Sequence, residues 1–173
     1  MRVLSFVVLT LMLASCATAP AGNGSSGAAS SNTATPTQTQ SFVAALEAKR
    51  GSALTLAERL QVQGLTGTAK VGLNNAQNNF LNKVGAQVGL NGAVIAALFP
   101  EAGKPLSENA VVSKIEGSLG KKLTAADQAA VKTATVLRNN SLASLKTGLA
   151  ASIGSRIGMS TEIVLALMPM LGL

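Results

Sequence analysis

The stretch that decides the fold is LNNAQNNFLNKVGAQVGL at residues 73–90, because its pattern returns as LASLKTGLAASIGSRIGM at residues 142–159. In both stretches, apolar residues follow one another at intervals of three, four, four and four. Those intervals place five apolar side chains along one face of a helix. The aligned pairs are Leu73 and Leu142, Ala76 and Leu145, Phe80 and Leu149, Val84 and Ile153, and Val88 and Ile157.

The likeness continues on both sides of these stretches. A shift of 69 positions lays residues 41–103 on residues 110–172 without a gap, and 15 of the 63 aligned pairs are identical. About five identities are expected by chance at this composition, so we interpret the chain as a duplicated unit with two pseudo-repeats.

Each unit is expected to hold four helices, so the predicted fold class is all-α. The chain is poor in aromatic residues, at 2%, and rich in Ala and Leu, which favours closely packed helices. Three glycines, Gly64, Gly67 and Gly72, lie in or next to the second helix of the first copy and weaken its prediction. The predicted helices of the first copy span residues 41–50, 56–71, 73–88 and 92–99, and those of the second copy lie 69 residues later.

Capping residues recur at the same places in the two copies. Thr55 with Glu58 forms the pattern of a capping box, and Thr124 with Asp127 forms a weaker version of it. The aligned pairs with expected roles are Gly51 and Gly120 at helix C-termini, Gly89 and Gly158 at the next C-termini, Asn91 and Ser160 as N-caps, and Gly85 and Gly154 as sites where another helix approaches closely.

The N-terminus carries a different signal. Met1-Arg2 is followed by an apolar run from Val3 to Leu13, and small residues then lead to Cys16, the single cysteine of the chain. A positive start, a short apolar run and a small-residue cleavage zone are the layout of a secretory signal peptide. The stretch Leu13-Ala14-Ser15-Cys16 resembles the lipobox of bacterial lipoproteins.

This resemblance implies a modification and a location. Cleavage between Ser15 and Cys16 would remove residues 1–15, and Cys16 would carry a diacylglycerol on its thiol and an acyl chain such as palmitate on its new amino group. Residue 17 is Ala rather than Asp, which in Gram-negative lipoproteins points to the outer membrane. We therefore expect a lipid-anchored protein of the cell envelope that faces the periplasm.

The expected organisation follows from these two signals. After the signal peptide 1–15, residues 16–40 contain no charge and read as an acylated cysteine with a disordered tether. The first helical unit spans residues 41–103, a connector spans 104–109, and the second unit spans 110–173. We expect the two units to form one folded domain, and the sequence does not indicate an oligomeric state.

Few residues offer chemistry. The chain has no histidine, and its one cysteine is assigned to lipid, so we expect no metal, no cofactor and no enzymatic activity. Glu47 and Glu116 align between the copies, which leaves open either a cross-copy carboxylate pair or two separate surface acids. Without residues 1–15, thirteen Lys and Arg stand against seven Asp and Glu, but the cations are scattered and no aromatic residues lie among them. Nucleic acid is therefore not an expected partner.

The C-terminal stretch is the strongest remaining candidate for binding. It is apolar and rich in methionine, a composition suited to adaptable hydrophobic surfaces, and it could equally complete the core. The candidate surface residues are Ile163, Leu165, Leu167, Met168, Met170 and Leu171.

Two hypotheses for the function follow. The first is a non-enzymatic helical binding or assembly module, tied to membrane lipid by its anchor and able to engage a protein of the envelope. The alternative is a carrier or sensor of a lipid-like hydrophobic ligand held between the two helical units.

Overall fold

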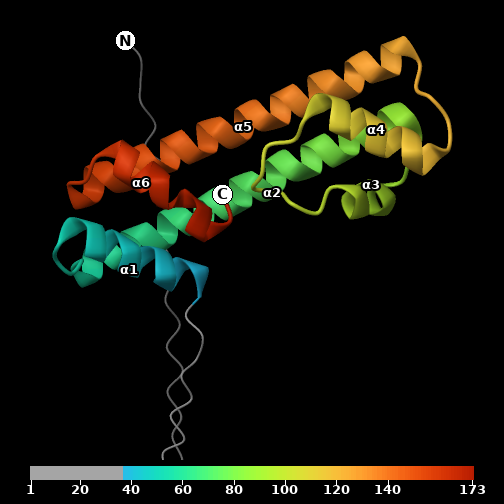
Figure 1. Ribbon diagram of the computed structural model, residues 1–173. Coiled ribbons are helices and arrows are strands. Elements are labelled where there is room, and N and C mark those ends of the chain that lie inside the picture. The colour runs from blue at the N-terminus through green and yellow to red at the C-terminus, as the bar shows by residue number, and fades with distance from the viewer. Residues whose placement is uncertain (1–36) are drawn as a thin grey trace, which may run out of the picture. The chain divides into compact units, whose positions relative to one another are not determined.

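The computed structural model describes residues 37–173, and these residues form helices and loops with no strand among them. The all-α fold class is therefore confirmed for this part of the chain. The predicted signal peptide and residues 16–36 of the predicted tether lie outside the described residues. The helices are α1 Gln38–Arg50, α2 Leu56–Val88, α3 Gly92–Leu98, α4 Glu108–Leu119, α5 Ala125–Ile157 and α6 Thr161–Leu167, followed by the 3-10 helix η1 Met168–Leu171 (Figure 1).

The prediction of four helices in each unit is wrong. The break expected near Gly72 is absent, and the predicted helices 56–71 and 73–88 form the single 33-residue helix α2. Their counterparts form α5, which also has 33 residues. A glycine within a helix costs only about 1 kcal/mol against alanine, and burial of one helix face can offset that cost. In this part of α2, Thr66 and Ala69 are buried, so tertiary packing outweighs the weak local propensity.

The long helices α2 and α5 lie side by side and run antiparallel (Figure 1). Gln87, near the end of α2, donates to Asp127 near the start of α5, with the Gln87 Nε2 and Asp127 Oδ1 atoms 2.7 Å apart. Further along, Leu145 of α5 lies against Gly72 of α2, where an added Cβ would come within 2.8 Å of the Leu145 Cδ2 atom. Gly72 is thus explained by close packing against α5 rather than by a break in the helix.

The core consists of two hydrophobic clusters, and each cluster takes residues from both α2 and α5. The first joins the N-terminal part of α2 and the C-terminal part of α5 to α1, α6 and η1. The second joins the C-terminal part of α2 and the N-terminal part of α5 to α3 and α4. Residues that are at most 1% exposed include Phe42, Leu46, Val62, Ile153 and Val164 in the first cluster and Val84, Ile95, Val111, Ile115 and Val131 in the second.

The capping predictions are confirmed. Thr55 and Glu58 form a complete capping box, whereas the Thr124 side chain caps the Asp127 N–H without the reciprocal bond to its own backbone. Asn91 and Ser160 cap α3 and α6. The four expected C-terminal glycines have left-handed backbones, with φ of 77° at Gly51, 65° at Gly120, 70° at Gly89 and 67° at Gly158.

Gly85 and Gly154 have a different role from the one expected. The next helix does come within contact distance, with Ile95 of α3 3.8 Å from an added Cβ at Gly85 and Thr161 N of α6 3.6 Å from one at Gly154, but the nearest atoms belong to the chain that leaves each helix and folds back over the glycine. An added Cβ would lie 2.8 Å from the Leu90 carbonyl oxygen at Gly85 and 2.6 Å from the Met159 carbonyl oxygen at Gly154. The backbone N–H of each of these two following residues donates to the glycine carbonyl, as in a Schellman motif.

Helix α1 begins three residues earlier than expected. Thr37 caps it, and Gln40 returns a hydrogen bond to the Thr37 backbone, which completes a capping box. This box of a threonine and a glutamine lies in the stretch assigned to the tether, so residues 38–40 belong to the helix.

Candidate functional site

The C-terminal residues proposed as a hydrophobic surface divide between core and surface. Met168 and Leu171 are 1% and 4% exposed and belong to the first cluster, so they hold η1 against α1 and the rest of the core. Leu165 and Leu167 are half-buried against the same cluster. Only Ile163 and Met170, each 40% exposed, remain open to an external partner.

The proposed lipid attachment site cannot be placed. Ser15 and Cys16 lie outside the described residues, so cleavage between them and acylation of Cys16 stay predictions. Within residues 37–173, no helix is both long and apolar enough to cross a membrane.

The two aligned glutamates each fasten a loop of their own unit. Glu47 Oε1 accepts from the Leu54 backbone N–H at 3.0 Å and from Arg59, whose Nη2 is 2.7 Å away. Glu116 Oε1 accepts from the Leu123 backbone N–H at 3.1 Å, and its Oε2 lies 2.6 Å from Lys122 Nζ. Each carboxylate thus joins the end of one helix to the loop before the next, and the partners of neither come from the other unit.

The hydrogen-bond partners of Glu116 favour its charged form. The hydrogen bonds from Lys122 and from the Leu123 backbone hold the pKa of Glu116 below its ordinary value, against the opposing effect of desolvation. A carboxylate with a lowered pKa and filled hydrogen bonds is a structural group rather than a general base.

Arg138, in the middle of α5, is 3% exposed and forms a polar centre that sequence analysis missed. Its Nε donates to Gln77 Oε1 of α2 at 2.6 Å, and its guanidinium carbon lies 5.6 Å from the centre of the Phe80 ring. Nη1 donates to the Lys104 carbonyl and, weakly, to Asn139 Oδ1, while Nη2 donates to the carbonyls of Glu101 and Ala102. Every N–H of this guanidinium is therefore used within the chain.

Arg138 and Asn139 together hold the segment between α3 and α4. Asn139 both donates to the Leu106 carbonyl and accepts from the Leu106 N–H, at 2.8 and 3.0 Å. One signal in the sequence could have drawn attention to Arg138: the residue aligned with it in the first copy is Ala69, so the charge departs from the repeat.

An apolar groove with a volume of about 340 Å³ lies between α2 and α5. We call it the apolar end of the α2–α5 groove. Its lining contains no charged side chain, and its polar groups are three hydroxyls. It is lined by Leu65, Thr68 and Ala69 of α2 and by Ser144, Leu145, Gly148, Leu149 and Ser152 of α5.

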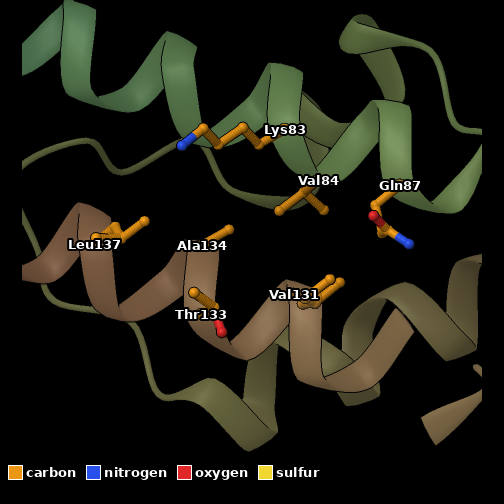
Figure 2. A pocket seen from close by; sticks show the side chains of 8 residues that line it. Lys83, Val84, Gln87, Val131, Thr133, Ala134 and Leu137 are labelled. Carbon is orange, nitrogen blue, oxygen red and sulfur yellow. The ribbon is translucent and has the colours of Figure 1, made fainter. Parts of the chain in front are cut away.

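Two further hollows lie on the same face of the two helices, and we call them the lysine end. They share no lining residue with the apolar end, and the close contact of Leu145 with Gly72 lies between Ala69 and Ala76, which line the two ends. One of about 240 Å³ includes Asn79, Lys83 and Arg138, and the next, of about 320 Å³, shares Lys83 and includes Gln87. Figure 2 shows the Lys83 side chain extended along α2, with its amine on the side of Leu137 and away from Gln87. The α2 residues that line these hollows lie three, four or seven positions apart and therefore share one helix face: Leu65, Ala69, Ala76, Asn79, Lys83 and Gln87.

The two ends differ at equivalent positions of the sequence. A shift of 69 residues carries Asn79 onto Gly148 and Lys83 onto Ser152, and it carries Ala69 onto Arg138. Gly148 lies inside α5, and nothing stands within 4 Å of where its Cβ would be. No contact within residues 37–173 accounts for this glycine, which costs the helix about 1 kcal/mol against alanine.

No group of three or more Asp, Glu, His or Cys residues that could hold a metal ion occurs within residues 37–173. Comparison with known proteins found no matching family, no matching curated protein and no matching solved structure.

Proposed function

We propose that the protein is a lipoprotein of the cell envelope that acts, without catalysis, as a helical binding module. Acylated Cys16 would hold it in the outer membrane on the periplasmic side, and the helical region would bind a hydrophobic partner. The support for the anchor is the lipobox-like stretch at residues 13–16. Two or more acyl chains suffice for long-lived attachment to a bilayer, whereas one gives marginal binding.

The binding surface we propose is the α2–α5 groove, and the observation that carries the proposal is the apolar end of this groove. An uncharged hollow of about 340 Å³ lies within the range of ligand sites, which are mostly apolar with a few polar groups. The exposed pair Ile163 and Met170 offers a smaller second contact.

The acidic residues support a role without catalysis, since each either has a structural partner or lies in the first turn of a helix. Glu47 and Glu116 fasten loops, and Glu58 and Asp127 act at helix N-termini. Glu101 pairs with Lys104, while Glu108 and Glu162 lie in the first turns of α4 and α6.

We also infer that the chain arose by duplication of a unit with three helices. The bounds of α2 and α5, and those of α3 and α6, differ by 69 at both ends. The buried residues follow the same shift, as when Val62 and Val131, or Ile95 and Val164, occupy corresponding places in the two clusters.

The anchor is tested by feeding cells an alkyne-bearing fatty acid and isolating the full chain. The expected result is label on the wild type and none on Cys16→Ser, with residues 1–15 removed only from the wild type. An unlabelled wild-type chain that retains Met1 would refute the anchor. Binding through the groove is tested separately, by photo-crosslinking from position 68 in the full chain, where no adduct of any kind would refute it.

A further inference from the structure

We propose that two copies of this chain pair through the side of α2 that faces away from α5, with the two α2 helices antiparallel about a two-fold axis. The inference rests on the proposed function only in that the anchors hold both copies in one membrane, and it does not depend on the groove. It adds a second interaction surface and assigns its partner. We call this surface the free edge of α2, and it consists of Leu56, Leu60, Gly64, Gly67 and Val71.

The free edge of α2 is apolar although it is exposed. Leu56, Leu60 and Val71 are 75%, 58% and 59% exposed, and they are the three most exposed large apolar side chains within residues 37–173. Gly64 and Gly67 lie between them, and the five positions follow one another at intervals of three or four, so they share one helix face. The most exposed apolar surface of the described chain is therefore gathered on one side of one helix.

This face is directed away from α5 and carries no charge. Gly67 lies two positions, or about 200° of helix rotation, from both Leu65 and Ala69, which line the hollow against α5. Helices on a protein surface ordinarily carry charged side chains toward solvent, whereas the centre of a protein interface is depleted in charge. The same face of α2 continues with exposed but uncharged residues: Asn74, Asn78 and Asn82.

Gly64 and Gly67 have no explanation within one copy. Nothing in residues 37–173 stands within 4 Å of an added Cβ at either position, although glycine disfavours a helix. A glycine on a helix surface lets the backbone of another helix approach closely, while a bilayer gains nothing from a missing side chain. The aligned residues of α5 are Thr133 and Val136, so the feature belongs to α2 alone.

The spacing along the free edge is the same in both directions, which indicates a second copy of the chain as the partner. Leu60, Gly64, Gly67 and Val71 follow one another at intervals of four, three and four. A two-fold axis midway between residues 65 and 66 therefore places Gly64 against Gly67 of the second copy and Leu60 against its Val71. Crossing helices separate on either side of their closest point, so glycines suit the crossing and larger side chains suit the positions beyond it. A different protein would require no such symmetry.

The two-fold arrangement also suits two copies in one membrane. The short helices, α1 among them, pack on α2 and α5 through the two hydrophobic clusters, whereas α2 and α5 alone line the hollows on their other side. Antiparallel helices in one layer are related by an axis perpendicular to that layer, so α1 lies on the same side of the layer in both copies. Thr37, where α1 is capped and the chain toward Cys16 begins, therefore lies on the same side in both copies.

The size of the contact sets its strength. The stretch 56–75, which the axis maps onto itself, extends over about 28 Å, and a helix face about 10 Å wide gives a strip of roughly 280 Å² per copy. Stable dimers in solution bury roughly 800 Å² per partner. The pairing is therefore weak in dilute solution, where thermal melting reports on a single copy. It becomes extensive when two anchored copies share one membrane at a high effective concentration.

The test uses a pair of cysteine substitutions in the full chain, in membranes isolated from cells that process lipoproteins. In Leu60→Cys/Val71→Cys, the axis places the thiol at position 60 beside the thiol at position 71 of the second copy. Within one copy these positions are about 16 Å apart along the helix, too far for a disulfide. Oxidation with copper phenanthroline should give a covalent dimer, and peptide mass should identify the 60–71 linkage. Each single variant should give about a tenth of this yield or less, because like positions are also about 16 Å apart across the axis.

The duplication supplies a matched control. Ala129→Cys/Asn140→Cys lies 69 positions later at exposed places in α5 and should give no more dimer than the single variants. Gly67→Leu, added to the α2 pair, should lower the yield to the same level by separating the helices. Gly148→Leu, at an open glycine on the side of the hollows, should leave the yield unchanged. Circular dichroism of each variant checks that it folds.

Incorporation of an alkyne-bearing fatty acid, measured on the same samples, separates the pairing from the anchor. A labelled chain without the 60–71 linkage would overturn the pairing and leave the anchor and the groove standing. Equal yields from the α2 and α5 pairs would mean random collision in the membrane and would also overturn it. A dimer from the single variants, or a yield unaffected by Gly67→Leu, would refute the antiparallel arrangement. An unlabelled chain without the linkage would refute the anchor and the pairing together, whereas the linkage in an unlabelled chain would support the pairing and refute the anchor.

Discussion

Replacement of Arg138 by methionine tests whether one buried cation fastens the two halves of the chain together. Methionine keeps the apolar stem of the side chain and removes all five N–H donors. The acceptors that lose their donor are Gln77 Oε1 and the carbonyls of Glu101, Ala102 and Lys104.

The expected loss of stability follows from which of these acceptors can reach water. The hydrogen bonds to the three carbonyls are only partly buried, so water replaces much of what these carbonyls lose. Gln77 is 7% exposed, and its oxygen stays buried without a donor. An unsatisfied buried acceptor costs about 1–3 kcal/mol, and lost hydrogen bonds to a charged group add a similar amount. The desolvation of the cation, which lowers the pKa of Arg138, is relieved in return. We expect Arg138→Met to lower the free energy of unfolding by about 3 kcal/mol.

Urea unfolding of the full chain, followed by circular dichroism, measures this change. Hydrogen exchange should also show lost protection in the segment between α3 and α4 before the rest of the chain opens. Arg156→Met is the matched control, because Arg156 is exposed in the last turn of α5 and its loss should change stability by no more than about 0.5 kcal/mol. If Arg138→Met and Arg156→Met prove equally stable, Arg138 does not hold the segment as described.

Three further predictions concern the acid response, the glycines and the shared cores. The pKa of Glu116 in the folded chain lies below its unfolded value near 4.5, so the stabilisation from the Glu116 carboxylate is complete above pH 4.5 and is lost as the pH falls through the folded pKa. Glu116→Gln should therefore flatten the acid side of the curve of unfolding free energy against pH, measured by urea titration. An unchanged curve would contradict the role of the carboxylate. Gly64→Ala should raise the melting temperature through a gain of about 1 kcal/mol in helix propensity, whereas Gly154→Ala should lower it, since the new Cβ would meet the Met159 carbonyl oxygen. A lower melting temperature for Gly64→Ala than for Gly154→Ala would refute the close backbone contact at Gly154. Fragments 37–103 and 104–173 should each show little helix alone and regain it when mixed, because each hydrophobic cluster contains residues from both fragments. A cooperative thermal melt of either fragment by itself would rule out shared cores.

Helix caps could be predicted at single-residue precision where they depend only on residues a few positions away in the sequence. Thr55 with Glu58 and Gly51 at a helix end are patterns whose partners lie within a few positions. The box formed by Thr37 and Gln40 was equally readable, but it lies in a stretch whose polar composition indicated a tether. The error at Gly72 was of another kind, because the contact with Leu145 that explains this glycine spans 73 positions of the chain.

The groove between α2 and α5 was not predictable in the same way. The sequence drew attention to the apolar C-terminus, where Met168 and Leu171 proved to be core residues. Leu65 and Gly148, by contrast, line one hollow only because α2 and α5 run antiparallel at a particular register. Nothing in either local stretch encodes that pairing, and Gly148 alone reads as a flaw in a helix.

What the sequence by itself determined is the helical class, the caps at Thr55, Thr124 and the C-terminal glycines, and the 69-residue correspondence, since hydrophobic period and capping act over one or two turns. What only the tertiary structure decided is how the halves share their cores: the two long helices pass through both clusters, and Arg138 reaches across to the segment between α3 and α4. The two 33-residue helices bury their apolar faces against each other and against the shorter helices of both clusters, so the pairing of distant residues, and the groove it leaves open, follows from packing.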